Sequence, residues 1–409
     1  MDATGLTIFA LVYLGMLAGG VPGLLIDRTG IALLGAIALL ATERVGVDEA
    51  WQAVDVETIA LLFGLMIVSA QLRQGGFYGL VTRRLTLHQT SPERLLALVI
   101  VLAGALSAVL VNDIVCLAMT PVLIEVCARR KLDPVPFLLA LACAANVGSA
   151  ATLIGNPQNM LLGQRLGLSF AGYLLDASVP VLLGLGVVWL VIRALYGGRW
   201  NAAPLPDATK QARALQVRFD AWQSTKGLLV LGGIVLLFLF TELPRELVAL
   251  TGAGILLVSR RTASRAQLAL VDWHLLVLFI GLFVVNHAFS ASGAAAAMVH
   301  EAAAVGLDLR EPGWLFVVAA TLSNLVSNVP AVMLLLPAAT DPLAGPVLAL
   351  SSTLAGNLIV VGSIANIIVL EQASRTGLEI DWRTHARVGV PVTLATLAIA
   401  GAWLWLLGA

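Results

Sequence analysis

Charged residues are scarce in this sequence, and their scarcity excludes most soluble folds. Only 12% of the 409 residues are charged, whereas 59% are hydrophobic, and the mean hydropathy is +0.94. Soluble domains average about 25% charged residues. Apolar runs suited to crossing a bilayer, which takes about 20 residues, occur from residues 6–21 to residues 390–407. The composition therefore predicts an all-α polytopic membrane protein.

Cysteine and net charge are scarce as well. The three cysteines, Cys116, Cys127 and Cys143, fall in apolar stretches and give neither a disulfide framework nor a metal-binding spacing. The formal net charge is zero, so no nucleic-acid partner is implied. The N-terminal MDATG lacks a basic region, so we expect the first apolar run to be a span rather than a cleaved signal. No cofactor or metal is expected.

What the sequence does contain is a second copy of itself. The residues that coincide after a shift of 216 or 217 positions include Val54-Asp55 with Val271-Asp272, Gly64-Leu65 with Gly281-Leu282, and Ser107, Asn112 and Pro121 with Ser323, Asn328 and Pro337. After small deletions, AANVG (144–148) matches AGNLI (355–359), and GNPQN (155–159) matches GSIAN (362–366). Matched polar and helix-breaking residues in constant order predict two repeats. We place them at 1–195 and 227–409, joined by a cytoplasmic linker at 196–226.

Lysine and arginine positions predict how the chain threads the membrane, because they favour cytoplasmic loops. Basic segments flank the apolar block 95–128, which Asn112-Asp113 interrupts, so we predict a re-entrant hairpin there and another at about 313–344. Broken spans follow at about 134–160 and 346–370. The remaining spans are expected at about 6–22, 30–43, 57–72, 168–194, 227–241, 246–259, 273–290 and 389–408.

This threading gives ten spans and two hairpins, with both termini on the outer side and the two repeats inverted. It leaves 20 of the 24 Lys and Arg residues on one face, since Arg44, Arg165, Arg245 and Arg310 fall on the other. A twelve-span threading, in which each hairpin crosses fully, is the alternative.

Amides and hydroxyls interrupt the apolar runs at the hairpin tips and span breaks. Non-helical backbone at membrane depth occurs only where it is buried in protein or lines an aqueous cavity, and paired broken helices in inverted repeats are typical of secondary transporters. We therefore predict a solute site near the midplane, with Asn324 supporting the second tip. The alternative is that these groups cap helix breaks without touching solute. The candidate ligands are Asn112, Asn146, Ser149, Thr152, Asn156, Asn159, Ser327, Asn328, Asn357, Ser363 and Asn366.

Asp113 is the predicted site of proton or ion coupling. Its repeat partner is Val329, and a carboxylate deep in a bilayer is by default a functional hypothesis. Burial favours the protonated form of such a group. The alternative is a carboxylate with a structural role, held by neighbouring backbone amides at the hairpin tip. No Lys or Arg occurs in the four site elements, which favours a neutral or weakly charged solute or a cation.

Other reactive side chains have simpler interpretations. Cys116 shares a helical face with Asp113, where a thiolate would suit a soft metalloid, but a buried core residue is the competing interpretation. We expect Asp176 and His287 to be interfacial and Glu125 to be solvated.

Four stretches resemble the signature regions of the ion-transporter superfamily, which includes arsenite-efflux permeases, some sodium/proton antiporters and divalent-anion/sodium symporters. They are LVNDIVCLAMTP (110–121), NVGSAATLIGNPQN (146–159), SNLVSNVP (323–330) and AGNLIVVGSIAN (355–366). The Asn-Asp hairpin followed by Thr120-Pro121 is most similar to the arsenite-permease branch, and the GNPQN turn to uncharacterised bacterial anion permeases of that branch.

The resemblance implies two inverted repeats, a scaffold with a moving transport part, and a site at the hairpin tips. The positions it nominates are Asn112, Asp113, Asn146, Asn159, Asn328, Asn357 and Asn366. The paired Ser-Asn-Thr sodium motifs of the dicarboxylate symporters are not intact, because Val329 follows Ser327-Asn328. That departure argues against sodium coupling and dicarboxylate transport.

We therefore expect a secondary active transporter of the bacterial inner membrane that exports arsenite, antimonite or a related small inorganic solute in exchange for a proton. A sodium/proton antiporter, a general anion (dicarboxylate or oxyanion) permease and a channel stay open as alternatives. An enzyme is not expected, since HEAAA (300–304), in a predicted outer loop, lacks the second histidine of a zinc-binding helix. Besides the bilayer, the partners considered are a second copy of the chain and, for an arsenite pump, a soluble ATPase subunit.

Overall fold

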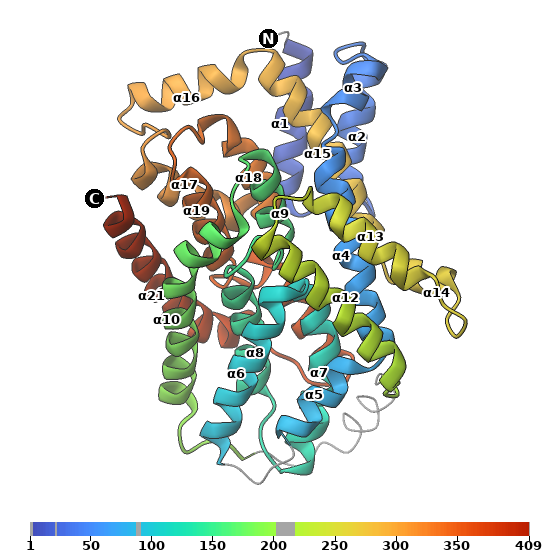
Figure 1. The fold of residues 1–409 in the computed structure, drawn as a ribbon. Coiled ribbons are helices and arrows are strands. Elements are labelled where there is room, and N and C mark those ends of the chain that lie inside the picture. Colours follow the sequence, from blue (N-terminus) through green and yellow to red (C-terminus); the bar gives the residue numbers. More distant parts are fainter. Residues whose placement is uncertain (1–2, 21–22, 87–90, 202–216, 409) are drawn as a thin grey trace.

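The computed structural model describes residues 3–20, 23–86, 91–201 and 217–408, and all its regular elements within these ranges are helices (Figure 1). The first half contains α1 (Ala3–Ala18), α2 (Arg28–Ala41), α3 (Val47–Ala53), α4 (Val56–Gln74), α5 (Phe77–Thr86), α6 (Pro92–Val109), α7 (Asn112–Arg129), α8 (Val135–Ser149), α9 (Pro157–Arg165) and α10 (Phe170–Tyr196). The second half contains α12 (Ala221–Phe240), α13 (Arg245–Leu257), α14 (Ser264–Leu268), α15 (Trp273–Ala291), α16 (Ala294–Ala304), α17 (Pro312–Val326), α18 (Asn328–Leu335), η1 (Leu336–Ala338), α19 (Ala344–Ala355), η2 (Val360–Gly362), α20 (Ile364–Ser374) and α21 (Trp382–Gly408).

Length and composition suit six of the described helices to crossing a membrane: α4, α6, α10, α12, α15 and α21. Side-chain caps fix where several of them begin. Asp55 accepts a hydrogen bond from the Thr58 N–H at the start of α4, and Asp272 accepts one from the Leu275 N–H at the start of α15. Such caps satisfy backbone donors that a helix start would otherwise leave unpaired. The two caps occupy corresponding positions of the predicted repeats.

The helices are interrupted where the polar islands lie in the sequence. Leu110 and Val111 separate α6 from α7, and Ser327 alone separates α17 from α18. Residues 150–156 separate α8 from α9, and residues 356–363, which include η2, separate α19 from α20. In Figure 1, α6 and α7 lie in the lower half of the view, and α17 and α18 in the upper half.

Several segments that we expected to be loops are helical. α5 lies inside the predicted basic loop 73–94, and α16 contains the HEAAA sequence that we placed in an outer loop. α16 forms because seven of its eleven residues are alanine, the strongest helix former. α12 begins at Ala221, inside the range given to the linker, because Asp220 caps it through the N–H groups of Trp222 and Gln223. Residues 202–216 of that linker lie outside the described residues.

One close helix contact occurs twice, at positions 217 residues apart. A Cβ atom added to Gly64 of α4 would lie 2.7 Å from the carbonyl carbon of Ala249 in α13. One added to Gly281 of α15 would lie 2.7 Å from the carbonyl carbon of Ala32 in α2. Glycine at both places allows the helix backbones to touch, which is how membrane helices pack most closely. In both contacts a helix of one half packs against a helix of the other: α4 against α13, and α15 against α2.

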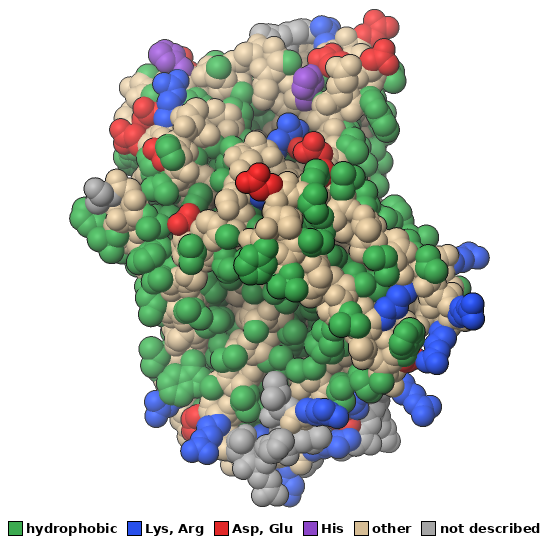
Figure 2. All heavy atoms as spheres, in the orientation of Figure 1, with side chains coloured by type: hydrophobic (Ala, Val, Ile, Leu, Met, Phe, Trp, Pro, Cys, Tyr) green, Lys and Arg blue, Asp and Glu red, His purple; other side chains and the backbone are tan. Residues whose placement is uncertain are grey.

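The surface has a broad hydrophobic band between two polar ends (Figure 2). Most Lys and Arg side chains in this view gather at the lower end and lower right, while many acidic side chains lie toward the upper end. Leucines such as Leu11, Leu182 and Leu229 are more than half exposed, as lipid-facing residues are expected to be. The chain is a multi-pass membrane protein.

Candidate solute-binding site

Four helices begin around one small cavity. It has a volume of about 30 Å³, room for roughly two water molecules. The residues that line it are Asn112 and Asp113 of α7; Asn156, Pro157 and Gln158 at the start of α9; Ser327, Asn328 and Val329 at the start of α18; Ser363 and Ile364 at the start of α20; and Asn146, Leu275 and Thr353. Helix N-termini carry partial positive charge and unpaired N–H groups, so their convergence favours the oxygen atoms of a ligand.

The four helix starts are not equivalent. Asn156 caps α9 by accepting from the Asn159 N–H, and Ser363 caps α20 by accepting from the Ala365 N–H. Neither α7 nor α18 has a side-chain cap. The helix starts at the two predicted hairpin tips are therefore the ones where a bound solute could take the place of a capping group.

Asn146 joins the two halves at the back of the cavity. Its Nδ2 donates to Asn357 Oδ1 at 2.8 Å and to Asn366 Oδ1 at 3.1 Å. Its Oδ1 accepts from Ser363 Oγ at 2.7 Å and from Asn112 Nδ2 at 3.3 Å. The 2%-exposed Asn146 thus fixes α7 and the second break against α8, because buried amides must find partners inside the protein.

Asn159 and Asn366 hold the two helix breaks by the same pair of bonds. Asn159 Nδ2 donates to the carbonyl oxygens of Thr152 and Ser149, at 3.0 and 3.5 Å. Asn366 Nδ2 donates to those of Ile359 and Gly356, at 3.3 and 2.8 Å. Each acceptor in the second half lies 207 positions after its counterpart. These asparagines therefore satisfy carbonyls that the unwound backbone exposes, which is the structural role weighed as the alternative to solute contact.

Asp113 is the one charged residue among those lining the cavity. It is partly exposed and lies in the first turn of α7, where the helix dipole favours negative charge. Within the described part of the chain its carboxylate forms no hydrogen bond or ion pair. It is therefore free to interact with a proton or a solute.

Ser327, at the second hairpin tip, has a backbone conformation that is rare outside glycine, with φ 80° and ψ 160°. Holding a residue with a Cβ there costs about 1–3 kcal/mol, and such strain clusters at ligand sites. Neighbouring polar contacts hold the tip, since Ser323 Oγ lies within hydrogen-bonding distance of both Asn328 Oδ1 and the Ser352 carbonyl. Asn324, expected to support this tip, instead donates to the Ala320 carbonyl of its own helix.

The cavity brings together only part of the predicted set. The predicted residues that line it are Asn112, Asp113, Asn146, Asn156, Ser327, Asn328 and Ser363. Those that lie behind it, as hydrogen-bonding partners or supports of the breaks, are Ser149, Thr152, Asn159, Asn357 and Asn366. Cys116 is fully buried and is not in the lining.

Two polar lining residues were missed. Gln158 Nε2 and Asn156 Nδ2 both donate to Thr353 Oγ1, at 3.1 and 3.2 Å. Gln158 lies inside the GNPQN turn, which was a usable signal. Thr353 belongs to the regular helix α19, and its repeat partner is Ala142, so nothing in the repeat pattern marked it. Glu125 also differs from expectation: it is 2% exposed, and its carboxylate pairs with Arg129 at 2.5 Å.

Comparison with known proteins decides the family. Residues 9–348 match the family model described as "Citrate transporter". The chain belongs to the citrate transporter family. This membership confirms the resemblance to the ion-transporter superfamily drawn from the four motifs.

Several relatives of this citrate transporter family member are named as transporters. It is 30% identical to the silicon efflux transporter LSI3 of Oryza sativa subsp. japonica, over 97% of this chain and 96% of that one. It is 24% identical to the putative transporter arsB of Dictyostelium discoideum, over 91% of this chain and 86% of that one. Its fold is similar to the crystal structure of the Alcanivorax borkumensis YdaH transporter, with a TM-score of 0.58 and 16% identity, over 98% and 97% of the two chains. The chain is a membrane transporter.

Proposed function

We propose that this transporter exports a small, uncharged, hydroxylated inorganic solute, of the arsenous or silicic acid type, in exchange for a proton. The observation that carries the proposal is the lining of the cavity. Amides, hydroxyls and uncapped helix starts surround it, with one carboxylate and no Lys or Arg among the lining residues. Amide groups both donate and accept hydrogen bonds, which matches a solute made of O–H groups.

The same lining disfavours a tricarboxylate as the solute, despite the name of the family. Several carboxylates would have to leave water and lie close to Asp113 without a cation to pair with, and unpaired buried charge is costly. The names of two relatives support the smaller solute, one being a silicon efflux transporter and the other a putative transporter called arsB.

Coupling follows from the position of Asp113. As a carboxylate it accepts a hydrogen bond from a solute O–H group. When a proton arrives from the outer side, this acceptor is lost and the solute leaves. The proton is then released on the inner side, where the empty carboxylate binds the next solute. Solute and proton thus occupy the same group in turn, which makes the exchange obligatory.

The proposal includes the membrane arrangement predicted from the sequence. Two inverted repeats of five spans and one hairpin each would bring the hairpin tips together from opposite faces, with the linker in the cytoplasm of a bacterial cell. The repeated α4–α13 and α15–α2 contact, and the placement of the two hairpins in opposite halves of Figure 1, support this arrangement.

A second candidate is a permease for a singly charged anion, which the four converging helix starts favour. Everted inner-membrane vesicles carrying the transporter would separate the two. With an imposed proton gradient, we expect the vesicles to accumulate arsenite, antimonite and germanic acid. Addition of each solute should partly dissipate the proton gradient. Uptake of phosphate or succinate instead, or sodium exchange without these solutes, would reject the proposal.

A further inference from the structure

Two further cavities lie on either side of the amide site, along its helices. The α7–α20 cavity is lined by Arg73, Leu117, Pro121, Gln372 and Arg375 among others, and has a volume of about 380 Å³. The second, the α9–α18 cavity, also has a volume of about 380 Å³. Its lining matches that of the first through the repeat: Met333 for Leu117, Pro337 for Pro121, Ser290 for Arg73 and Arg165 for Gln372.

The two cavities differ in how their arginines are paired. In the α9–α18 cavity, Arg165 lies 2.6 Å from the carboxylate of Asp55 and stacks over the ring of Phe283 at 5.4 Å. In the α7–α20 cavity, the corresponding residue is the uncharged Gln372, and the arginine comes from the opposite wall. That arginine, Arg73, is partly buried and forms no hydrogen bond or ion pair with any described residue.

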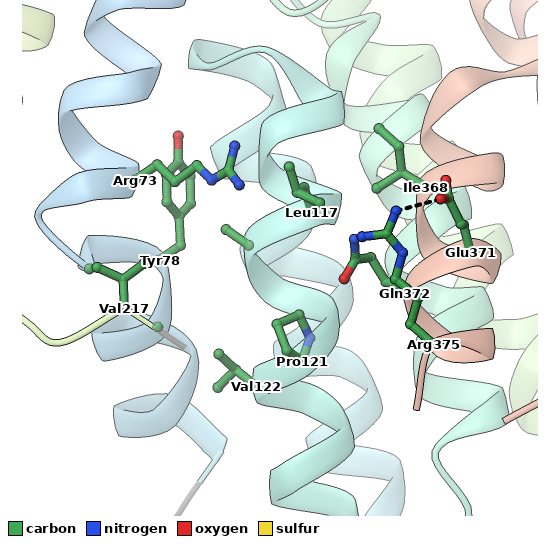
Figure 3. A pocket seen from close by; sticks show the side chains of 13 residues that line it. Arg73, Tyr78, Leu117, Pro121, Val122, Val217, Ile368, Glu371, Gln372 and Arg375 are labelled. Atoms are coloured by element: carbon green, nitrogen blue, oxygen red, sulfur yellow. Dashed lines mark hydrogen bonds and ion pairs between the residues drawn. The ribbon is translucent and has the colours of Figure 1, made fainter. Parts of the chain in front are cut away.

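Donors from two sides face the α7–α20 cavity (Figure 3). Arg73 extends from the end of α4 on one side of α7, and Gln372 of α20 and Arg375, which follows that helix, lie on the other. Arg375 donates to Glu371 at 2.6 Å, so the lining carries two guanidinium groups, one carboxylate and one excess positive charge. Gln372 is only 8% exposed as a whole residue, and its side chain has no hydrogen bond within the described ranges, although it lines the cavity.

We propose that the α7–α20 cavity binds one small, singly charged inorganic oxyanion between Arg73, Gln372 and Arg375. A guanidinium group presents paired N–H donors that match two oxygens of an oxyanion. The amide of Gln372, which faces the cavity, supplies a further donor that no described residue uses. The volume admits such an anion together with bridging water. This site lies beyond the amide cavity and takes a different class of ligand from the transported solute.

The α9–α18 cavity explains why only one such site is expected. Asp55 already neutralises Arg165, so an anion there would have to displace a carboxylate held at 2.6 Å. The two cavities therefore form a matched pair in which one arginine has its counterion from the protein and the other takes it from solution.

The test is calorimetric titration of the purified full-length protein in detergent with inorganic phosphate, at mildly acidic pH where the singly charged form prevails. We expect one phosphate per chain. Arg73→Gln should weaken binding by about tenfold or more, because a hydrogen bond to a charged group contributes at least the free energy of a tenfold change in affinity. Arg73→Lys should retain part of the affinity, and Gln372→Leu should lower it severalfold. The matched control Arg165→Gln, in the other cavity, should leave it unchanged.

Melting temperatures of the variants establish that each is folded; if Arg73→Gln is not, Arg73→Lys and Gln372→Leu decide the question. Absence of phosphate binding in the unmodified protein would overturn the proposal, as would equal binding in Arg73→Gln. Weaker phosphate binding in Arg165→Gln would also overturn it. So would binding of phosphatidylglycerol, and not of phosphate, at this site. Because the titration involves no solute gradient, its failure leaves the proposed transport activity untouched.

Discussion

At the scale of single residues, Asp113 is where the two halves of the cavity differ in charge. Its repeat partner Val329 lines the same cavity, so one hairpin tip brings a carboxylate and the other an apolar side chain. A carrier that exchanges solute for a proton needs one titratable group at its site, and the chain places one there.

Asp113→Asn should abolish proton-coupled transport, because an amide cannot bind and release the proton. Solute flux into everted vesicles should fall to the level of empty vesicles, while the melting temperature changes little, since the carboxylate has no partner among the described residues. Asp176→Asn is the control carboxylate, away from the cavity lining, and should keep normal flux. Normal flux in Asp113→Asn would remove this residue from the mechanism.

Asn146 and Asn328 should separate structure from transport. Asn146→Leu leaves Asn112, Asn357 and Ser363 without a shared partner, so we expect a loss of about 2–3 kcal/mol in stability and a clearly lower melting temperature. Asn328→Ala removes a lining amide whose hydrogen-bonding partner is Ser323, and should lower flux at least tenfold with a near-normal melting temperature. The opposite pattern would mean that the two roles are exchanged.

Ser327→Gly should stabilise the folded protein but lower its transport rate. Glycine accepts φ 80° and ψ 160° without strain, so the free energy of unfolding should rise by up to about 1–3 kcal/mol. The same change loosens the second hairpin tip and should reduce the transport rate. Ser290→Gly, within the regular helix α15, is the control and should destabilise by about 0.5 kcal/mol. A lower melting temperature in Ser327→Gly would contradict the strain argument.

At the scale of elements, the Gly64 and Gly281 contacts hold each half against the other. Gly64→Ala and Gly281→Ala should each destabilise the protein by about 1–3 kcal/mol, because the added methyl meets backbone rather than a movable side chain. Gly232→Ala in α12 is the matched control, since nothing lies within 4 Å of its added Cβ. Thermal unfolding of the three variants measures this, and equal melting temperatures would argue against a backbone contact.

The sequence predicts the interruptions of the helices better than the helices between them. Asn112, Asn156 and Ser363 stand out because amides, hydroxyls, glycine and proline are conspicuous in apolar runs, and each lies at a helix start. α5 and α16 were missed because charge and polarity were taken as signs of loops, whereas the alanines of α16 favour a helix without any apolar stripe. Thr353 could not be found, because it reaches the cavity only through the packing of α19 beside α9.

At the scale of the whole molecule, the uneven distribution of lysine and arginine predicts the orientation of the chain in the membrane. Cysteines introduced one at a time at Arg260 and Glu301 test it, because both positions are exposed and the native cysteines are buried. A membrane-impermeant maleimide should label the Glu301→Cys variant in intact cells, and the Arg260→Cys variant only after the membrane is opened. Labelling in the reverse order would invert the proposed topology.

The equal size of the two cavities beside the amide site bears on the direction of flow. Cavities of equal volume, about 380 Å³ each, give no steric reason for a solute to approach the site from one side rather than the other. A carrier that works by the proposed exchange is thermodynamically reversible, so net movement follows the larger of the solute and proton driving forces. Under the proposed exchange, a cell whose membrane potential collapsed would take the solute back through the same protein that had expelled it.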